Sequence, residues 1–254
     1  MRLDQFLVQM GWSPSRTKAQ EMIERGDVRV LLQGVSINAK ASLEVTDDHR
    51  VLITSQELNK FVSRGGLKLE SALERAQIKP QGKIFLDVGQ STGGFTDCLL
   101  QSGAEVVVGI DSGHGQLHEK ISKHDKVIFF ENVNARELQN LPIITSHFPD
   151  NGFDGLVMDV SFISQKVLWA SCLPYLKTEG DFLSLVKPQF EVGINNLDKH
   201  GIVKDENLYT IVKCEIVEGL KNLNMDVIDY FPCKLPGRDG NQEFFVYAKK
   251  RRLP

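Results

Sequence analysis

From Ile84 onward, short runs of apolar and β-branched residues alternate with segments of helical pattern. This alternation is typical of βαβ units built on a parallel sheet. It predicts seven strands, at Ile84–Val88, Val106–Ile110, Val127–Phe130, Gly155–Met158, Phe182–Val186, Val227–Phe231 and Phe244–Ala248. The last two are joined by the turn-rich segment PCKLPGRDGNQ, which has no helical pattern, so we expect the final strand to run antiparallel.

The first sixty residues have a different pattern, of two short helices followed by short strands. Apolar residues follow the spacing of an amphipathic helix at Leu3, Phe6, Leu7 and Met10. We expect a second helix to start at Ser13-Pro14, a cap followed by a proline, and to end at Gly26. Three strands follow, at Val28–Leu31, Val35–Ile37 and Arg50–Ile53. A small α+β domain is therefore predicted before the large α/β domain, as the length of 254 residues also favours.

Charge restricts how this protein can bind nucleic acid. The net charge of -3 argues against a protein that coats nucleic acid by bulk electrostatics, so any RNA contact must be a local patch. Arg16 and Lys18 lie in the first turns of the second predicted helix, where the helix dipole disfavours cations. An RNA backbone lying across that helix end would favour them. The alternative is a solvated charged face.

The cysteines and the apolar segments bear on the compartment. The four cysteines lie far apart without a C-x-x-C pair, which fits neither a zinc ribbon nor a disulfide framework and favours a reducing cytoplasm. No stretch approaches the ~18 apolar residues of a membrane span, and the N-terminus lacks the apolar centre of a signal peptide. His114 and His118 are spaced like metal ligands, but no third ligand accompanies them, so we expect no metal.

A glycine-rich turn follows the first strand of the large domain. In FLDVGQSTGGFTDCLLQSGA, Gly89, Gly93 and Gly94 allow the backbone to approach a ligand, and the helix after them offers free amides. The next strand ends in Asp111, which can accept hydrogen bonds from ribose hydroxyls. A P-loop would need G-K-[ST], and a dinucleotide fold would need G-x-G-x-x-G. S-adenosylmethionine fits the turn best, and a tight turn without a ligand is the alternative.

Charged residues gather at one predicted edge of the sheet. Ligands in open α/β sheets bind beyond the carboxyl ends of the parallel strands, where Asp87, Asp111, Asp159 and Lys187 fall. Glu243 joins them because an antiparallel last strand begins at that edge. Lys68 precedes the first strand.

This set suits the deprotonation of a hydroxyl. A ribose 2′-hydroxyl is a poor nucleophile, and a lysine can act as its base when burial or a neighbouring cation lowers the lysine pKa. We expect Lys187 to be that base, with Asp159 and Glu243 orienting the two lysines. Taken singly, each charge could be a solvated strand end. The chain lacks the N-P-P-Y-like turn of base-amine methyltransferases and a cysteine near MDVSF that a cytosine-C5 enzyme would need.

Long motifs then connect the chain to a known family. KFVSRGGLKLESAL, FLDVGQSTGGFTDCLLQSGA, MDVSFIS, LVKPQFEVG, GIVKD and GRDGNQEFF closely resemble the TlyA family of haemolysin-A-like ribosomal RNA methyltransferases, which are relatives of FtsJ-type 2′-O-methyltransferases. Residues 2–37 resemble the RNA-binding domain named after ribosomal protein S4. The resemblance implies methyl transfer from S-adenosylmethionine to cytidine 2′-hydroxyls of 16S and/or 23S ribosomal RNA. It also implies a Rossmann-like methyltransferase sheet.

The resemblance assigns a role to each matching residue. It implies a catalytic set of Lys68, Asp159, Lys187 and Glu243. For the cofactor it implies Asp87, Gly89, Ser91, Gly93, Gly94, Phe95, Asp111 and Asn134. For RNA it implies Arg2, Arg16, Lys18 and Arg64. The expected domains are an S4-type domain at 1–59, a linker at 60–66 and a methyltransferase domain at 67–254.

Some positions depart from the family pattern. Gln90 stands where the family usually has a small residue, and its side chain could point outward or crowd the methionine end of the cofactor. Ser112, His114, Asn132-Val133 and His200 differ as well. These departures keep open the alternative of an RNA-binding protein that has lost catalysis, and the family name suggests a second, a membrane-lytic protein. The second would need an exposed amphipathic segment, and the sequence offers none.

Overall fold

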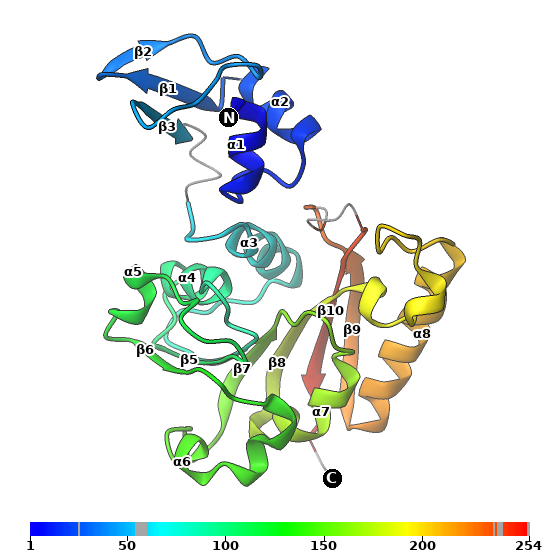
Figure 1. Cartoon of the computed structure of the whole chain (residues 1–254). Helices are drawn as coiled ribbons and strands as arrows, with labels where there is room; N and C mark the ends of the chain where they lie inside the picture. The colour runs from blue at the N-terminus through cyan, green and yellow to red at the C-terminus, as the bar shows by residue number, and fades with distance from the viewer. Residues whose placement is uncertain (25, 54–59, 236, 238–240, 253–254) are drawn as a thin grey trace. The chain divides into compact units, whose positions relative to one another are not determined.

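The structure is a computed structural model that describes residues 1–24, 26–53, 60–235, 237 and 241–252. The chain forms two compact units, Met1–Lys60 and Phe61–Pro254 (Figure 1). Residues 61–66, which we expected to lie in a linker, belong to the larger unit, because Phe61 is buried and a helix begins at Arg64. Residues 54–59, at the predicted domain boundary, 238–240, in the GRDGNQEFF motif, and 253–254, at the predicted C-terminal end of the methyltransferase domain, lie outside the described residues.

The smaller unit packs two helices against a three-stranded antiparallel sheet of order β2-β1-β3. Its elements are α1 (Leu3–Gln9), α2 (Arg16–Glu24), β1 (Val28–Leu32), β2 (Val35–Ile37) and β3 (His49–Ile53). Helix α2 begins later than predicted: the Lys18 N–H donates to Ser15 Oγ at 3.2 Å, so Ser15 rather than Ser13 caps the helix. Pro14 therefore precedes the helix instead of opening it.

The larger unit contains the seven-stranded sheet that the sequence predicts, in the order β6-β5-β4-β7-β8-β10-β9. Strands β4 to β8 run parallel, whereas β10 is antiparallel to both of its neighbours. The strands are β4 (Ile84–Val88), β5 (Val106–Ile110), β6 (Val127–Phe130), β7 (Phe153–Met158), β8 (Leu176–Val186), β9 (Met225–Pro232) and β10 (Phe244–Lys250). The fold class and the reversed last strand are confirmed.

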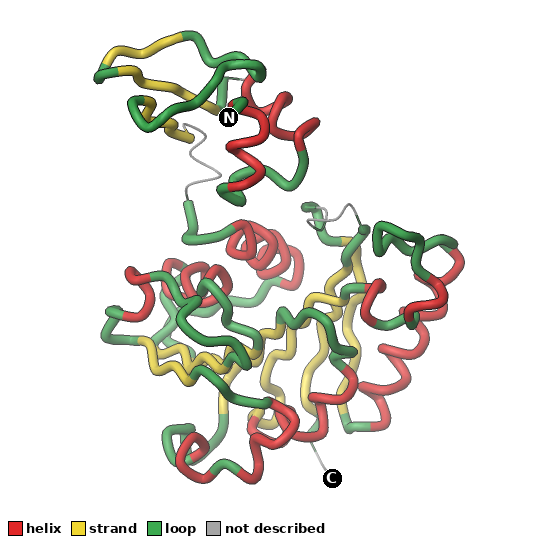
Figure 2. The backbone as a smooth tube through the Cα atoms, viewed as in Figure 1, coloured by secondary structure: helices red, strands yellow, loops and turns green. Residues whose placement is uncertain are grey.

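Helices cover both faces of this sheet (Figure 2). On one face, α3 (Arg64–Ala76) and α4 (Gly94–Gln101) bury apolar residues against Phe85 and Phe245. On the other, α7 (Lys166–Cys172) and α8 (Asn207–Asn222) pack over Leu86 and Val246. Neighbouring strand residues enter opposite cores, as the alternation of side chains along a strand requires.

Short helical segments complete the larger unit. They are α5 (Glu119–Ser122), α6 (Pro142–Thr145), η1 (Ala135–Asn140), η2 (Leu173–Tyr175), η3 (Pro188–Phe190) and η4 (Ile194–Asn196). Within the described residues, none of the helices has the length and apolar character that crossing a membrane requires.

Candidate active site at the carboxyl edge of the sheet

Two lysine–carboxylate pairs meet at the carboxyl ends of β7 and β8. Lys187 Nζ lies 2.6 Å from Asp159 Oδ1 and donates to Ser161 Oγ at 2.8 Å. Lys68, on α3, places Nζ 2.5 Å from Glu243 Oε2. All four residues line one cavity of about 420 Å³, which we call the β7–β8 cavity. The structure therefore brings the four predicted catalytic residues together.

These charged groups are largely shielded from water. The side chains of Lys187 and Lys68 are each 12% exposed, and that of Glu243 is 4% exposed. In such surroundings charges interact more strongly than in bulk solvent. Each lysine has its own carboxylate, so the set of four has no net charge when all are ionised. The pairing fixes where each ammonium or amine group lies.

A second cavity of about 400 Å³ adjoins the first and lies over the ends of β4 and β5. Asp111 lines it, and the carboxylate accepts the N–H groups of Ser91 at 2.7 Å and Gly113 at 2.6 Å. Asn134 lines the same cavity and caps η1 through the Arg136 N–H. Asp159 lines both cavities, so a ligand in this β4–β5 cavity would lie next to the lysine pairs.

The three glycines of the turn serve different purposes. Gly89 has φ +83°, and a Cβ there would lie 2.4 Å from the carbonyl oxygen of Asp159, so only glycine allows these two loops to approach. A side chain at Gly94 would collide with Ser63 Oγ, and one at Gly93 would lie 2.9 Å from Leu117. Gly93 lines neither cavity. The expectation that all three admit a ligand is corrected: Gly93 allows protein packing.

Asp87 also differs from its predicted role. It is fully buried, lines neither cavity, and accepts the Thr96 hydroxyl at 2.7 Å. Burial is the main cause that raises the pKa of Asp87 to about 7. The side chain therefore supports the turn from beneath instead of reaching the cavity.

The same network shows where Gln90 points. Its Nε2 donates to Thr96 Oγ1 at 2.8 Å, and its amide packs so closely on Gly109 that a Cβ there would lie 2.1 Å away. The side chain is turned toward α4 and β5, and only 5% of the residue is exposed. Gln90 borders the β7–β8 cavity without filling it. The departure from the family pattern is accommodated by packing against a glycine.

Sequence reasoning missed an aromatic pair at this cavity. Phe162 is 91% exposed, has a left-handed backbone with φ 63°, and lies with its ring centroid 5.2 Å from that of Phe190. Both residues line the β7–β8 cavity, as do the predicted Phe95 and Arg64. The sequence contains a signal for this pair, because Phe162 and Phe190 each follow a charged strand-end residue, Asp159 or Lys187, by three residues.

A buried carboxylate joins the two loops that carry Asp159 and Lys187. Glu191 accepts the Ser164 hydroxyl at 2.5 Å and the Gln165 N–H at 3.0 Å. Gln165 in turn accepts the Ser184 hydroxyl of β8 at 2.5 Å. Burial raises the pKa of Glu191, although the two donors oppose this. We call these hydrogen bonds the Glu191 clamp, and they hold the β7 loop against the β8 loop.

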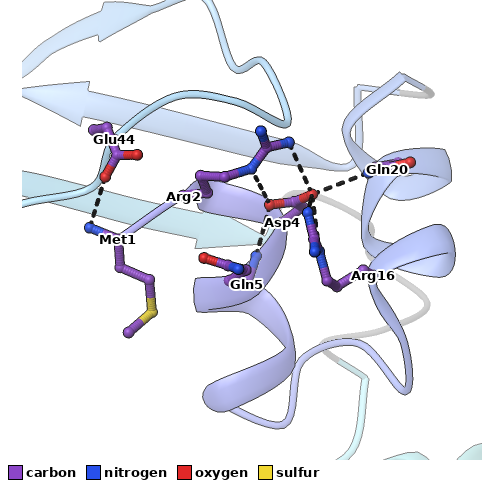
Figure 3. Close-up of polar contacts among 7 residues, drawn as sticks. All are labelled: Met1, Arg2, Asp4, Gln5, Arg16, Gln20 and Glu44. Atoms are coloured by element: carbon purple, nitrogen blue, oxygen red, sulfur yellow. Dashed lines mark hydrogen bonds and ion pairs between the residues drawn. The ribbon is translucent and has the colours of Figure 1, made fainter.

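The smaller unit holds two of its predicted RNA-binding cations, Arg2 and Arg16, in an internal network around Asp4 (Figure 3). Asp4, which is fully buried, accepts from Arg2 at 3.1 Å, Arg16 at 3.1 Å and Gln20 at 3.0 Å. These donors, Arg2 first, lower the Asp4 pKa despite burial. Lys18 pairs with Glu21 at 2.5 Å. Protein carboxylates therefore supply negative charge beside both cations at this helix start, which neither the RNA backbone nor the solvated face considered from the sequence included.

Comparison with known proteins agrees with this geometry. Residues 61–250 match the FtsJ-like methyltransferase family, and residues 1–30 match the S4 domain. The chain belongs to the FtsJ-like methyltransferase family. Its enzymes use S-adenosylmethionine, and the carboxylate of Asp111, the side chain of Asn134 and the backbone of the glycine turn fit that cofactor in the β4–β5 cavity.

Two curated relatives of this FtsJ-like protein match nearly the whole chain, and a solved structure matches a smaller part. "Hemolysin A" of Brachyspira hyodysenteriae is 34% identical over 97% of this chain and 99% of its own. "16S/23S rRNA (cytidine-2'-O)-methyltransferase TlyA" of Mycobacterium tuberculosis is 34% identical over 98% of this chain and 89% of its own. A solved S-adenosylmethionine-dependent methyltransferase from Mesorhizobium loti shares the fold with a TM-score of 0.52 at 15% identity, over 70% of this chain and 96% of its own.

No group of three His, Cys, Asp or Glu side chains suited to a metal ion occurs among the described residues. His114 is one of the two histidines that are spaced like metal ligands in the sequence. It lies 3.1 Å from Glu131, which also accepts the Gly115 N–H. All four cysteines are free thiols, and only Cys214 is exposed.

Proposed function

We propose that this FtsJ-like enzyme methylates the ribose 2′-hydroxyl of a cytidine in 16S and/or 23S ribosomal RNA. The observation that carries the proposal is the pair of lysine–carboxylate contacts, Lys187–Asp159 and Lys68–Glu243, in a cavity beside the one that suits the cofactor. A relative 34% identical over 98% of the chain bears that activity in its name.

The lysine pairs suit a reaction that begins with a weakly acidic hydroxyl. Lys187, in its neutral form, takes the 2′-hydroxyl proton, and Asp159 stabilises the ammonium that forms. Lys68, held by Glu243, is a cation beside the oxygen as negative charge develops on it. The cofactor, when bound, supplies an electrophilic methyl group. The protein therefore has to orient the hydroxyl and remove its proton.

The aromatic pair supports a nucleotide substrate. An exposed phenylalanine next to a second ring offers a face on which a nucleic-acid base can stack, and such stacking stabilises unpaired bases. Phe162 and Phe190 lie at the same cavity as Lys187. We assign to them the binding of the base whose ribose is methylated.

The remaining site residues keep their proposed roles with two changes. Gly89, Ser91, Asp111 and Asn134 are assigned to cofactor contact because they line the β4–β5 cavity, and Gly94 and Phe95 border the neighbouring cavity. Asp87 and Gly93 shape the turn.

For RNA, we assign Arg2, Arg16 and Lys18 of the S4 domain, with Arg64 beside the catalytic cavity. The side chains of Arg2 and Arg16 are 39% and 53% exposed, so N–H groups remain for phosphates although Asp4 holds both. Ribosomes in the cytoplasm are the proposed partner.

Replacement of Lys187 tests this function. We expect Lys187→Ala to lower methyl incorporation into ribosomal subunits, prepared from cells that lack the gene, by about 100-fold or more, because a general base typically contributes that much. Affinity for S-adenosylmethionine should stay within a few-fold, since the lysine acts in the transition state. Lys221→Ala, on the exposed surface of α8, is the control. A parallel loss of cofactor binding would contradict the base role, and an inactive wild-type protein would leave only an RNA-binding module.

A further inference from the structure

The side-chain hydrogen bond of Lys187 goes to a serine rather than to its paired carboxylate. Lys187 Nζ donates to Ser161 Oγ at 2.8 Å. Asp159 Oδ1 lies closer, at 2.6 Å, but it has no hydrogen-bond partner among the described residues, so this contact is an ion pair without the alignment of a hydrogen bond. Coulombic attraction depends on distance, whereas a hydrogen bond depends on angle as well. Asp159 therefore keeps the nitrogen near, and Ser161 sets how it is turned.

Ser161 lies in the loop after β7, and its side chain is exposed. Among the described residues, its hydroxyl forms a hydrogen bond with Lys187 and with no other group. Ser161 lines both the β7–β8 cavity and the β4–β5 cavity, whereas Lys187 lines the first alone. The serine is therefore situated where the two cavities adjoin, and its oxygen is engaged by the lysine.

The proposed reaction makes this acceptor more important as it proceeds. When the 2′-hydroxyl proton moves to Nζ, the nitrogen lone pair forms the new N–H bond and the O–H electron pair stays on the ribose oxygen. Lys187 is then an ammonium with three N–H donors and no acceptor. One N–H faces the ribose oxygen, and Asp159 attracts another.

The third N–H of this ammonium also needs an acceptor. The Lys187 side chain is 12% exposed, so little water reaches it, and an unpaired donor on a shielded cation is unfavourable. Ser161 Oγ is already in place to accept that N–H. Its hydrogen bond therefore gains strength as the lysine becomes charged, because hydrogen bonds to ionised groups are stronger than those between neutral groups.

We propose that Ser161 is a positioning residue for methyl transfer, whose hydroxyl orients Lys187 and stabilises the ammonium that forms when the lysine takes the 2′-hydroxyl proton. This inference rests on the proposed function. Ser161 acts through Lys187 rather than on the ribose, the base or the cofactor. Its loss should therefore lower the rate of methyl transfer and leave both the KM for ribosomal subunits and the affinity for S-adenosylmethionine within about twofold.

Two substitutions of nearly equal size test the role of the hydroxyl. Threonine and valine have side chains of the same shape, and threonine alone keeps the oxygen acceptor. In single turnovers on ribosomal subunits from cells that lack the gene, we expect Ser161→Val to be about tenfold slower than wild type, the value of one hydrogen bond to a charged group. Ser161→Thr should stay within about threefold of wild type. Ser161→Ala, which adds no bulk, should also lose about tenfold.

A double-mutant cycle tests whether Ser161 acts through Lys187. In the Lys187→Ala protein, adding Ser161→Val should change the residual rate less than twofold, because the partner of the hydroxyl is already absent. A serine that contacts the substrate directly would instead cause the same tenfold loss in both backgrounds. Ser102→Val, at the exposed C-terminal end of α4 and outside both cavities, is the control. Thermal unfolding would show that the variants are folded.

Several results would overturn the inference alone. They are equal losses in the two backgrounds, an unchanged rate in Ser161→Ala, a Ser161→Thr rate as low as that of Ser161→Val, and a higher KM or weaker cofactor binding in place of a slower reaction. A wild-type enzyme that transfers no methyl group would overturn the proposed function as well.

Discussion

Single side chains in this protein often act on the chain itself rather than on a ligand. Asp87 and Thr96 lie beneath the glycine turn, and Asp4 joins the cations of the S4 domain. In sequence, Asp87 is part of a cofactor motif, and Arg16 lies at an unfavourable helix start. The sequence does not show that the Asp87 side chain points inward. Nor does it show that Arg16 pairs with the carboxylate of Asp4, which lies 12 residues away in the chain. Sequence patterns cannot predict such contacts between residues that are distant in the chain.

Asp87 makes stability depend on pH. Its folded pKa of about 7 lies above the value of about 4 expected for an unfolded aspartate, so the folded state binds more protons between these values. The free energy of unfolding should therefore fall as pH rises from about 4 to about 7, by on the order of 2 to 4 kcal/mol from this group. Asp87→Asn should lack this slope.

Urea unfolding at pH 5 and pH 8 measures the effect. The stability of Asp87→Asn relative to wild type should increase with pH, because only the wild type has to ionise a buried carboxyl. Asp125→Asn is the matched control, since the Asp125 side chain is 94% exposed. Parallel pH dependence in wild type and Asp87→Asn would show that Asp87 does not titrate with a raised pKa.

At the scale of elements, the seven strands and the reversed last strand follow from the sequence, and the strand boundaries follow less well. β8 starts at Leu176, six residues before its predicted start. Its first part, KTEGD, is polar and includes Glu179 with φ 61°, so it has the composition of a turn, and the pairing with β7 shifts register there. The clamp between the β7 and β8 loops also escapes prediction, because Ser164 and Glu191 are 27 residues apart.

This clamp predicts that Glu191 affects catalysis through position. Glu191→Ala should lower kcat about tenfold by loosening Asp159 against Lys187, with affinity for S-adenosylmethionine nearly unchanged. Glu191→Gln retains an acceptor for the Gln165 N–H and should recover much of the rate. Glu215→Ala is the control. It removes an exposed carboxylate 2.5 Å from Lys166, the lysine that also approaches Glu191. Equal losses in Glu191→Ala and Glu215→Ala would exclude the clamp.

At the scale of the whole molecule, the chain combines an S4 domain with an FtsJ-like methyltransferase domain. Both were predictable because their motifs are long and continuous in sequence. The residues expected to link them were assigned less accurately. Phe61 fills the core of the larger unit, and the Val62 N–H donates to Asp97 on α4 at 2.8 Å, a contact across 35 residues.

The central claim is that Lys187 and its partners methylate a ribose hydroxyl of ribosomal RNA. Mapping of 2′-O-methyl groups in ribosomal RNA tests it most directly, in cells that lack the gene and in the same cells supplied with wild type or Lys187→Ala. We predict that at least one cytidine loses its methyl group without the gene and regains it only with wild type. Identical methylation in all three, or full recovery with Lys187→Ala, would contradict the account.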